Sequence, residues 1–124
     1  VDLFKSVNDT FGHAIGDQVL KRVSSLLQEA FRSTDFVCRI GGDEFAVIMV
    51  DVTSDLRHII QEKIDFVNTE LSKPIDGMPQ VSLSAGAAFA DRPDPGDSIY
   101  KDADDALYHT KESGRGSCSF FGEF

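Results

Sequence analysis

The sequence predicts a single domain of mixed α/β class, an α+β sandwich in which helices pack against strands that include an antiparallel hairpin. Its 124 residues suffice for one hydrophobic core and are too few for two. Segments of helical period alternate with short apolar runs, and a Gly-Gly turn separates two such runs near the middle. The 41% hydrophobic and 27% charged content is typical of a globular protein, so residues 1–124 are expected to fold throughout.

The first predicted helix covers roughly residues 17–31. Gly16 precedes it and Asp17 can cap it. The apolar residues that share one face of this helix are Val19, Leu20, Val23, Leu26, Leu27 and Ala30. Residues 36–40 and 44–50 are predicted to be the strands of the hairpin.

The second half of the chain predicts two more helices and two more strands. Helical period returns after Thr53 and ends before Pro74. Residues 81–89 alternate between apolar and small polar side chains, which indicates a half-buried strand. A last helix, whose apolar face is Ile99, Ala103, Ala106, Leu107 and Thr110, ends at Gly114, and residues 118–121 close the domain as a strand. This order of elements is that of a mixed α/β domain.

Charge and composition exclude several classes of protein. A formal charge of −9 disfavours binding to a nucleic-acid polymer, although a single nucleotide needs only a few local cations. No apolar run is long enough to span a membrane and no leader precedes the domain, so we expect a cytoplasmic piece whose parent protein could still be membrane-anchored. Cys38 and Cys118 lack the spacing of a zinc site or a disulfide framework, and we expect two reduced thiols.

The segment with the clearest chemical character is the turn at residues 39–45, where two glycines precede two acids. Glycine lets a backbone approach a ligand closely, and adjacent carboxylates such as Asp43 and Glu44 can hold a hard cation. A plain Gly-Gly turn with solvated acids explains this segment equally well.

Four motifs in order resemble the GGDEF family of diguanylate cyclase domains. Residues 41–45 spell Gly-Gly-Asp-Glu-Phe, and residues 2–17 resemble the hallmark D-x-F-K-x-[IV]-N-D-x-[FY]-G-H-x-x-G-D. Residues 82–86 resemble the family's strand motif and residues 103–115 its last helix. The resemblance implies a fold like the palm of nucleotide cyclases and polymerases, with a central mixed sheet flanked by helices. It also implies that residues 1–124 lack the family's N-terminal helix, its loop and most of its first strand.

The same resemblance implies an enzyme. Diguanylate cyclases condense two GTP molecules into cyclic di-GMP by Mg²⁺-dependent (or Mn²⁺-dependent) attack of a 3′-hydroxyl on an α-phosphate. The implied partners are GTP, cyclic di-GMP, a second copy of the domain and a fused sensor or receiver domain. A noncatalytic sensor of GTP or cyclic di-GMP, or a scaffold for dimerisation, is the alternative, but the intact Asp43 and Glu44 favour the cyclase.

The resemblance also implies a GTP site. The residues on the guanine would be Asn8, Asp17 and Leu20, and those on the phosphates or ribose would be Leu3, Phe4, Lys5, Gly42, Lys111 and Arg115. By their positions alone, Asn8 and Asp17 would be interpreted as helix caps, Leu20 as a core residue, and Lys111 and Arg115 as partners of the helix dipole.

The implied catalytic residues are Asp43, as a ligand of Mg²⁺, and Glu44, which would serve a second metal or deprotonate the 3′-hydroxyl. The Val1 carbonyl would be a further ligand, while the family's first metal-binding Asp would lie ahead of Val1. We therefore expect a weak Mg²⁺ site in this chain. We also expect an exposed strand edge that can pair with another copy.

A second nucleotide site is implied by Arg32 and Asp35, which match the family's RxxD product-inhibition site, with Lys63 as a helper. An arginine fork suits guanine edges and phosphates, and a carboxylate suits guanine N–H groups. By itself the pair could be a surface ion pair of little energetic consequence.

Overall fold

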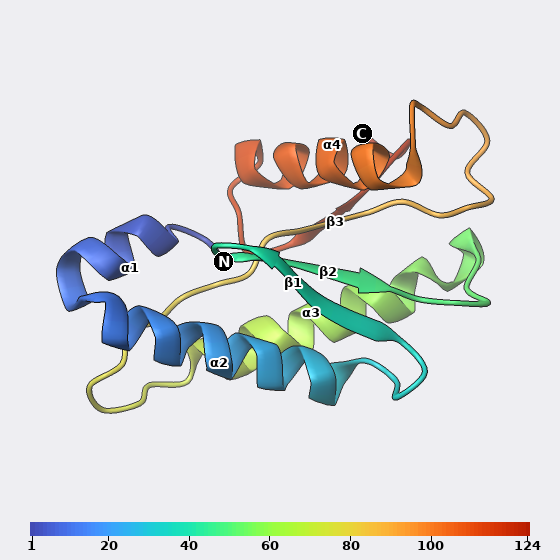
Figure 1. The fold of residues 1–124 in the computed structure, drawn as a ribbon. Helices are drawn as coiled ribbons and strands as arrows, with labels where there is room; N and C mark the ends of the chain where they lie inside the picture. The colour runs from blue at the N-terminus through green and yellow to red at the C-terminus, as the bar shows by residue number, and fades with distance from the viewer.

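The computed structural model describes residues 1–124 and confirms the mixed α/β class. The helices are α1 (Phe4–Phe11), α2 (His13–Ala30), α3 (Arg57–Ser72) and α4 (Ile99–Glu112). The strands are β1 (Phe36–Gly41), β2 (Glu44–Ile48), β3 (Ala85–Ala87) and β4 (Cys118–Phe120), and a 3₁₀ turn, Ser54–Leu56, precedes α3. In Figure 1, α2 and α3 lie below the strands and α4 lies above them. None of these helices has the length and apolar character that crossing a membrane requires.

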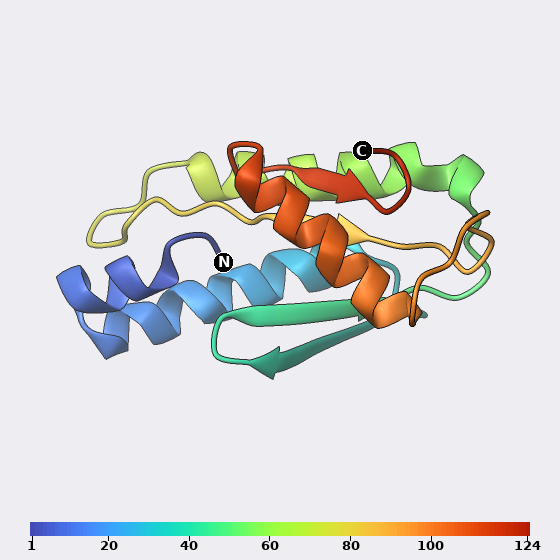
Figure 2. The same cartoon turned by 90° about the horizontal axis from the view of Figure 1, so that it is seen from above.

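The strands form two separate pairs. β1 and β2 make the predicted antiparallel hairpin, with Phe36 opposite Ile48, and β3 runs parallel to β4. Figure 2 shows the N terminus between the hairpin and the segment that leads into β3. The Val1 amino nitrogen lies 2.9 Å from the Asp43 carbonyl oxygen, and the Asp2 amide lies 2.9 Å from the Ser82 carbonyl oxygen. The first two residues therefore link the hairpin turn to the segment that leads into β3. Pairing of a strand edge with a second copy stays a prediction.

The core lies between α2, α3 and the strands. Val23, Val67 and Leu71 are fully buried within it, and each such side chain stabilises the fold by about 1.5–3 kcal/mol. Burial, together with the charge of Asp65, raises the pKa of the Cys118 thiol to about 12, so Cys118 acts as an apolar core residue. Cys38 is exposed, and both cysteines are free.

The predicted start of α2 was wrong. The helix begins at His13, Gly16 lies inside it, and Asp17 is exposed and caps nothing. Gly12, with φ of 89°, makes the turn that separates α1 from α2. Only glycine adopts this conformation readily, so the break falls at Gly12.

The predicted strand over residues 81–89 is much shorter in the structure, where only Ala85–Ala87 pair as β3. The Asn68 side chain explains part of the difference. Its Oδ1 accepts from the Leu83 amide at 2.7 Å, and its Nδ2 donates to the Leu83 carbonyl at 3.0 Å. An amide on α3 thus satisfies the backbone groups that a neighbouring strand would otherwise take.

Helix α4 is anchored by polar contacts at both ends. Ser98 caps its start by accepting from the Lys101 amide at 3.0 Å. The buried Asp102 carboxylate accepts from Arg92 Nε at 2.6 Å and from the Gly96 amide at 2.8 Å. Near the other end, Thr110 Oγ1 donates to the Ala85 carbonyl of β3 at 2.8 Å. These contacts fix the position of the last turn, which carries Lys111.

Candidate functional site

The hairpin turn lies beside the start of the chain and the end of α4. Asp43 Oδ2 is 3.8 Å from the Val1 amino nitrogen, and the Asp43 side chain is 41% exposed. Burial lowers the pKa of that amino group, Asp43, Asp2 and Glu44 raise it, and the charge of Lys111 lowers it further. The charges of these side chains therefore all act on the Val1 amino group, and the residues lie near it. The structure thus brings together the predicted acids and the predicted phosphate ligand Lys111.

The hairpin turn is shaped by an arginine to which the sequence assigned no role. The Arg39 guanidinium donates two hydrogen bonds to the Gly42 carbonyl, from Nε at 3.0 Å and from a terminal nitrogen at 2.8 Å. Gly42 has φ of 22°, and no atom lies within 4 Å of the place where its Cβ would be. The surface over Gly42 is therefore open to a ligand. The signal in the sequence for this role of Arg39 is its position two residues before the glycine pair.

Three residues predicted to lie on the phosphates, Leu3, Phe4 and Lys5, are at the start of α1, and we call them the phosphate cradle. Leu3 has the left-handed angles φ 55° and ψ 32° and is the N-cap of this helix, with no side-chain cap hydrogen bond. The first N–H groups of a helix have no acceptor within the helix, and they favour anions. Leu3 and Lys5 are exposed and Phe4 is partly buried.

Arg115 lies close to the buried carboxylate of Asp2, the residue that directly precedes the phosphate cradle. Its terminal nitrogen is 3.7 Å from Asp2 Oδ1, and the Arg115 side chain is 39% exposed. The next residue, Gly116, donates its amide to Asp2 Oδ2 at 3.2 Å. The sequence singled out Arg115 and gave Asp2 no role, although Asp2 opens the hallmark.

The predicted guanine ligands lie where α1 packs on α2. Asn8 Oδ1 is buried and has no hydrogen-bond partner within the chain. A Cβ on Gly16 would lie 2.0 Å from this oxygen, so the glycine makes room for the amide. Asp17 is exposed on α2, and Leu20, one turn on, is 5% exposed. No hydrogen bond or ion pair links Asn8 or Asp17 to the hairpin acids, and their roles stay predictions.

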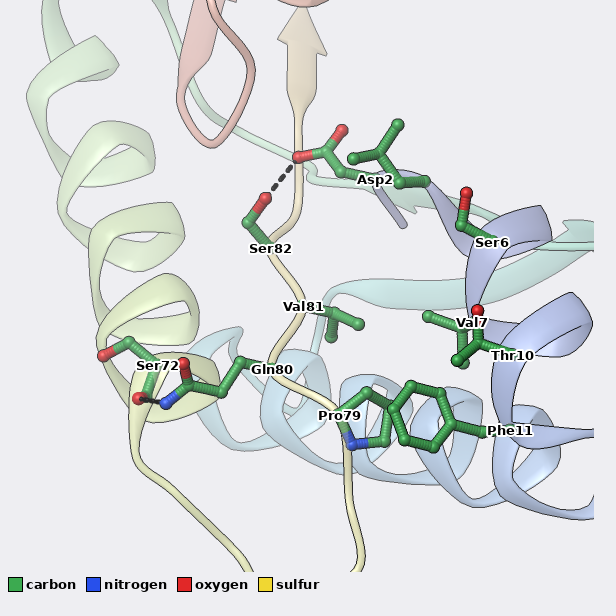
Figure 3. Close-up of a pocket in the computed structure, with 11 residues that line it drawn as sticks. Asp2, Ser6, Val7, Thr10, Phe11, Ser72, Pro79, Gln80, Val81 and Ser82 are labelled. Carbon is green, nitrogen blue, oxygen red and sulfur yellow. Dashed lines mark hydrogen bonds between the residues drawn. The ribbon is translucent and has the colours of Figure 1, made fainter.

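A cavity of about 510 Å³ opens between α1 and residues 79–82. Figure 3 shows Phe11 and Pro79 on its walls and the Ser82 hydroxyl bonded to Asp2. Of the predicted site residues only Leu3 lines it. The cavity therefore adjoins the phosphate cradle without including the hairpin acids or Asn8.

The chain by itself offers few ligands for a metal. No three His, Cys, Asp or Glu side chains gather in a group that could hold an ion. The partly exposed Asp43 carboxylate is nevertheless an oxygen ligand of the kind that Mg²⁺ takes together with phosphates.

The predicted inhibitory residues do lie together. A terminal guanidinium nitrogen of Arg32 donates to Asp35 Oδ1 at 2.7 Å, and the backbone amide of Arg32 donates to Asp35 Oδ2 at 2.8 Å. The hydrogen bonds from Arg32 hold the pKa of Asp35 below its usual value, against the effect of burial. Lys63 donates to the Ala30 carbonyl at 2.6 Å, and both basic residues line a cavity of about 110 Å³.

The family model for the diguanylate cyclase GGDEF domain matches residues 1–117, and the chain belongs to this family. It is 38% identical over 120 residues to the probable diguanylate cyclase DgcT of Escherichia coli (strain K12), covering 93% of this chain and 26% of that protein. The chain spans 17% to 38% of the length of the first three curated relatives.

Solved structures agree with this assignment. The GGDEF domain of YfiN (or TpbB) from Pseudomonas aeruginosa superposes with a TM-score of 0.84 at 34% identity, covering 99% of this chain and 78% of that one. The GGDEF domain of DgcB from Caulobacter crescentus, solved in complex with c-di-GMP, gives 0.77 at 28% identity over 96% of this chain and 72% of that one. These neighbours confirm the expected palm-like fold.

Proposed function

We propose that this domain is the catalytic module of a diguanylate cyclase, which joins two GTP molecules into cyclic di-GMP and releases two pyrophosphates. The observation that carries the proposal is the grouping of Asp43 and Glu44 with Lys111 around Val1. Phosphoryl transfer requires carboxylates that hold a metal cation and a positively charged group, such as the lysine ammonium, that binds phosphate. Named diguanylate cyclases among the relatives support the same reaction.

In this proposal the guanine binds at α1 and α2. The unpartnered Asn8 Oδ1 accepts an N–H of the base, which relieves a buried acceptor whose isolation costs about 1–3 kcal/mol. Asp17 accepts from the N1 and N2 donors of guanine, and Leu20 contacts the ring face. Gly42 lies under the ribose, where its open surface leaves room.

The phosphates bind between the start of α1 and the end of α4. Lys111, Arg115 and Lys5 supply positive charge, and the amides of Leu3 and Phe4 donate hydrogen bonds. Mg²⁺ or Mn²⁺, held by Asp43 and the Val1 carbonyl, would polarise the α-phosphate. Glu44 accepts the proton of the attacking 3′-hydroxyl or helps to hold a second ion.

The product contains two guanylates, and one domain binds one GTP in this proposal. Two copies must therefore bring their sites face to face, and a homodimer is the active form. The relatives are several times longer than this chain, so we propose that a fused sensor or receiver domain controls the pairing. The two free thiols support a cytoplasmic location.

Incubation of the full-length protein with GTP and Mg²⁺, followed by chromatography of the nucleotides, tests the proposed reaction. We expect cyclic di-GMP to accumulate and the reaction to stop on chelation of the metal. GTP binding without product would favour the noncatalytic sensor. A protein that binds neither GTP nor cyclic di-GMP would favour the scaffold.

We further propose that Arg32, Asp35 and Lys63 bind cyclic di-GMP as an inhibitor. Arg32 is 45% exposed, so part of its guanidinium is available beyond its bonds to Asp35. Lys63 lies 5.2 Å above the Phe31 ring and borders the same small cavity. The DgcB structure with bound c-di-GMP shows that a GGDEF domain can hold this nucleotide.

Replacement of Arg32 by Ala is expected to weaken product inhibition roughly tenfold or more, because a charged hydrogen-bond donor is lost. The initial rate should stay nearly unchanged, since Arg32 lies outside the GTP site. Initial rates measured against added cyclic di-GMP give both values. Arg57→Ala removes another exposed arginine with an acidic partner, Glu123, and is the matched control. Equal inhibition of both variants would reject this site.

A further inference from the structure

We propose that Asp2 is a positioning residue for GTP: its buried carboxylate holds the start of α1 and Arg115 in the arrangement that receives the phosphates. This inference rests on the proposed cyclase function. Asp2 is 6% exposed, and its side chain is the meeting point of three segments that lie far apart in the sequence.

Every oxygen of this carboxylate has a donor. Oδ1 accepts from the Ser84 hydroxyl at 2.6 Å, and Oδ2 accepts from the Ser82 hydroxyl at 2.6 Å, the bond drawn in Figure 3. Oδ2 also accepts from the Gly116 amide at 3.2 Å, and Arg115 lies 3.7 Å from Oδ1. A buried carboxylate is tolerated only when it is paired in this way. Its oxygens are therefore engaged by the protein and are not free to hold a metal.

On one side Asp2 controls the cradle. It directly precedes Leu3, whose φ of 55° is left-handed. A non-glycine residue persists in such a conformation only where its surroundings enforce it. The Asp2 amide bonds to the Ser82 carbonyl at 2.9 Å while its side chain bonds to Ser82 and Ser84. These contacts fix the backbone immediately before the amides that would bind phosphate.

On the other side Asp2 controls the loop after α4. Arg115 has φ of 66°, a second left-handed non-glycine residue next to the same carboxylate. Its amide bonds to the Thr110 carbonyl at 3.0 Å, and the Gly116 amide bonds to Asp2 and to Ser84 Oγ. With its backbone fixed and one terminal nitrogen directed at Asp2, the guanidinium keeps its other N–H groups for a ligand.

The Asp2→Asn variant tests this role. It keeps the size of the side chain but removes the charge that faces Arg115 and replaces one of the two acceptor oxygens with an NH2 donor, so the Ser82, Ser84 and Gly116 donors cannot all be satisfied as before. We expect the affinity for GTP with Mg²⁺ to fall about 10- to 100-fold, because charged hydrogen bonds of this type are disturbed. The affinity for guanosine, which has no phosphates, should change less than about twofold. A merely structural defect would weaken both ligands together.

Titration of full-length wild-type and variant proteins with GTP and with guanosine gives the two affinities, and circular dichroism checks the fold. If Asp2→Asn does not fold, Ser84→Ala loosens the same carboxylate and should weaken GTP alone, while Ser25→Ala, on the exposed face of α2, should change neither. In an Arg115→Ala background the loss from Asp2→Asn should shrink, because the two act together. An equal fall in the affinities for GTP and guanosine, or no fall in either, overturns the positioning role of Asp2. Failure of the wild-type protein to bind GTP overturns the proposed function instead.

Discussion

Replacement of Asp43 by Asn is expected to lower cyclic di-GMP production about 10²- to 10³-fold, the usual cost of removing one group that stabilises transition-state charge. The carboxylate lies beside the Val1 backbone and is 41% exposed, so it can reach a cation. Asn keeps the shape of the side chain and removes the negative charge that holds Mg²⁺. Rates measured over a range of Mg²⁺ concentrations should show a reduced maximum and a higher Mg²⁺ requirement.

The Asp43 variant should remain folded, because its side chain is 41% exposed and is not part of the hydrophobic core. Asp76→Asn, in the exposed loop after α3, removes the same charge elsewhere and should keep the wild-type rate. An Asp43→Asn protein as active as the Asp76 control at every Mg²⁺ concentration would mean that the hairpin acids do not hold the ion.

Replacement of Gly86 by Ala is expected to destabilise the domain by about 3 kcal/mol, the upper part of the range for overpacked sites. A Cβ at Gly86 would lie 2.1 Å from the Leu107 nitrogen and 2.3 Å from the Ala103 carbonyl oxygen. Both are backbone atoms of α4, so the clash is relieved only if the helix moves away from β3. Because α4 carries Lys111, GTP turnover should fall together with stability.

Thermal or urea unfolding of Gly86→Ala measures this cost. Gly41→Ala is the matched control for stability, because no atom lies within 4 Å of its Cβ position and its φ is not left-handed. The control should unfold at or slightly above the wild-type midpoint, since alanine lowers the entropy of the unfolded chain. Coincident unfolding of the two variants would contradict the close approach of β3 to α4.

The sequence predicted those elements that bury a continuous apolar face. Helices α2, α3 and α4 each repeat apolar residues at helical spacing, and the hairpin has an unmistakable Gly-Gly turn. Helix α1 was not predicted, because its eight residues give only a short pattern, although Phe4, Val7 and Phe11 recur at helical spacing. The short β3 was overestimated because alternation in residues 81–84 does not show that Asn68 takes the place of a partner strand.

The candidate site was predicted in part. The family motifs named the acids, Lys111 and Arg115, and the structure brings these to the start of the chain from opposite ends. Asp2 was missed because its donors lie 80, 82 and 114 residues away, where no spacing rule applies. The helix-cap interpretation of Asp17 was wrong because α2 begins directly after the turn at Gly12, four residues earlier in the sequence than Asp17.

The central claim is that the hairpin acids, the start of α1 and the end of α4 form one nucleotide site. Addition of Mn²⁺ with a slowly hydrolysed GTP analogue to isotope-labelled protein tests it by paramagnetic broadening of amide signals. Our account predicts broadening that depends on the nucleotide and centres on residues 1–5, 42–44 and 111–116. Broadening confined to the Arg32 region, or spread over surface acids irrespective of nucleotide, would contradict it.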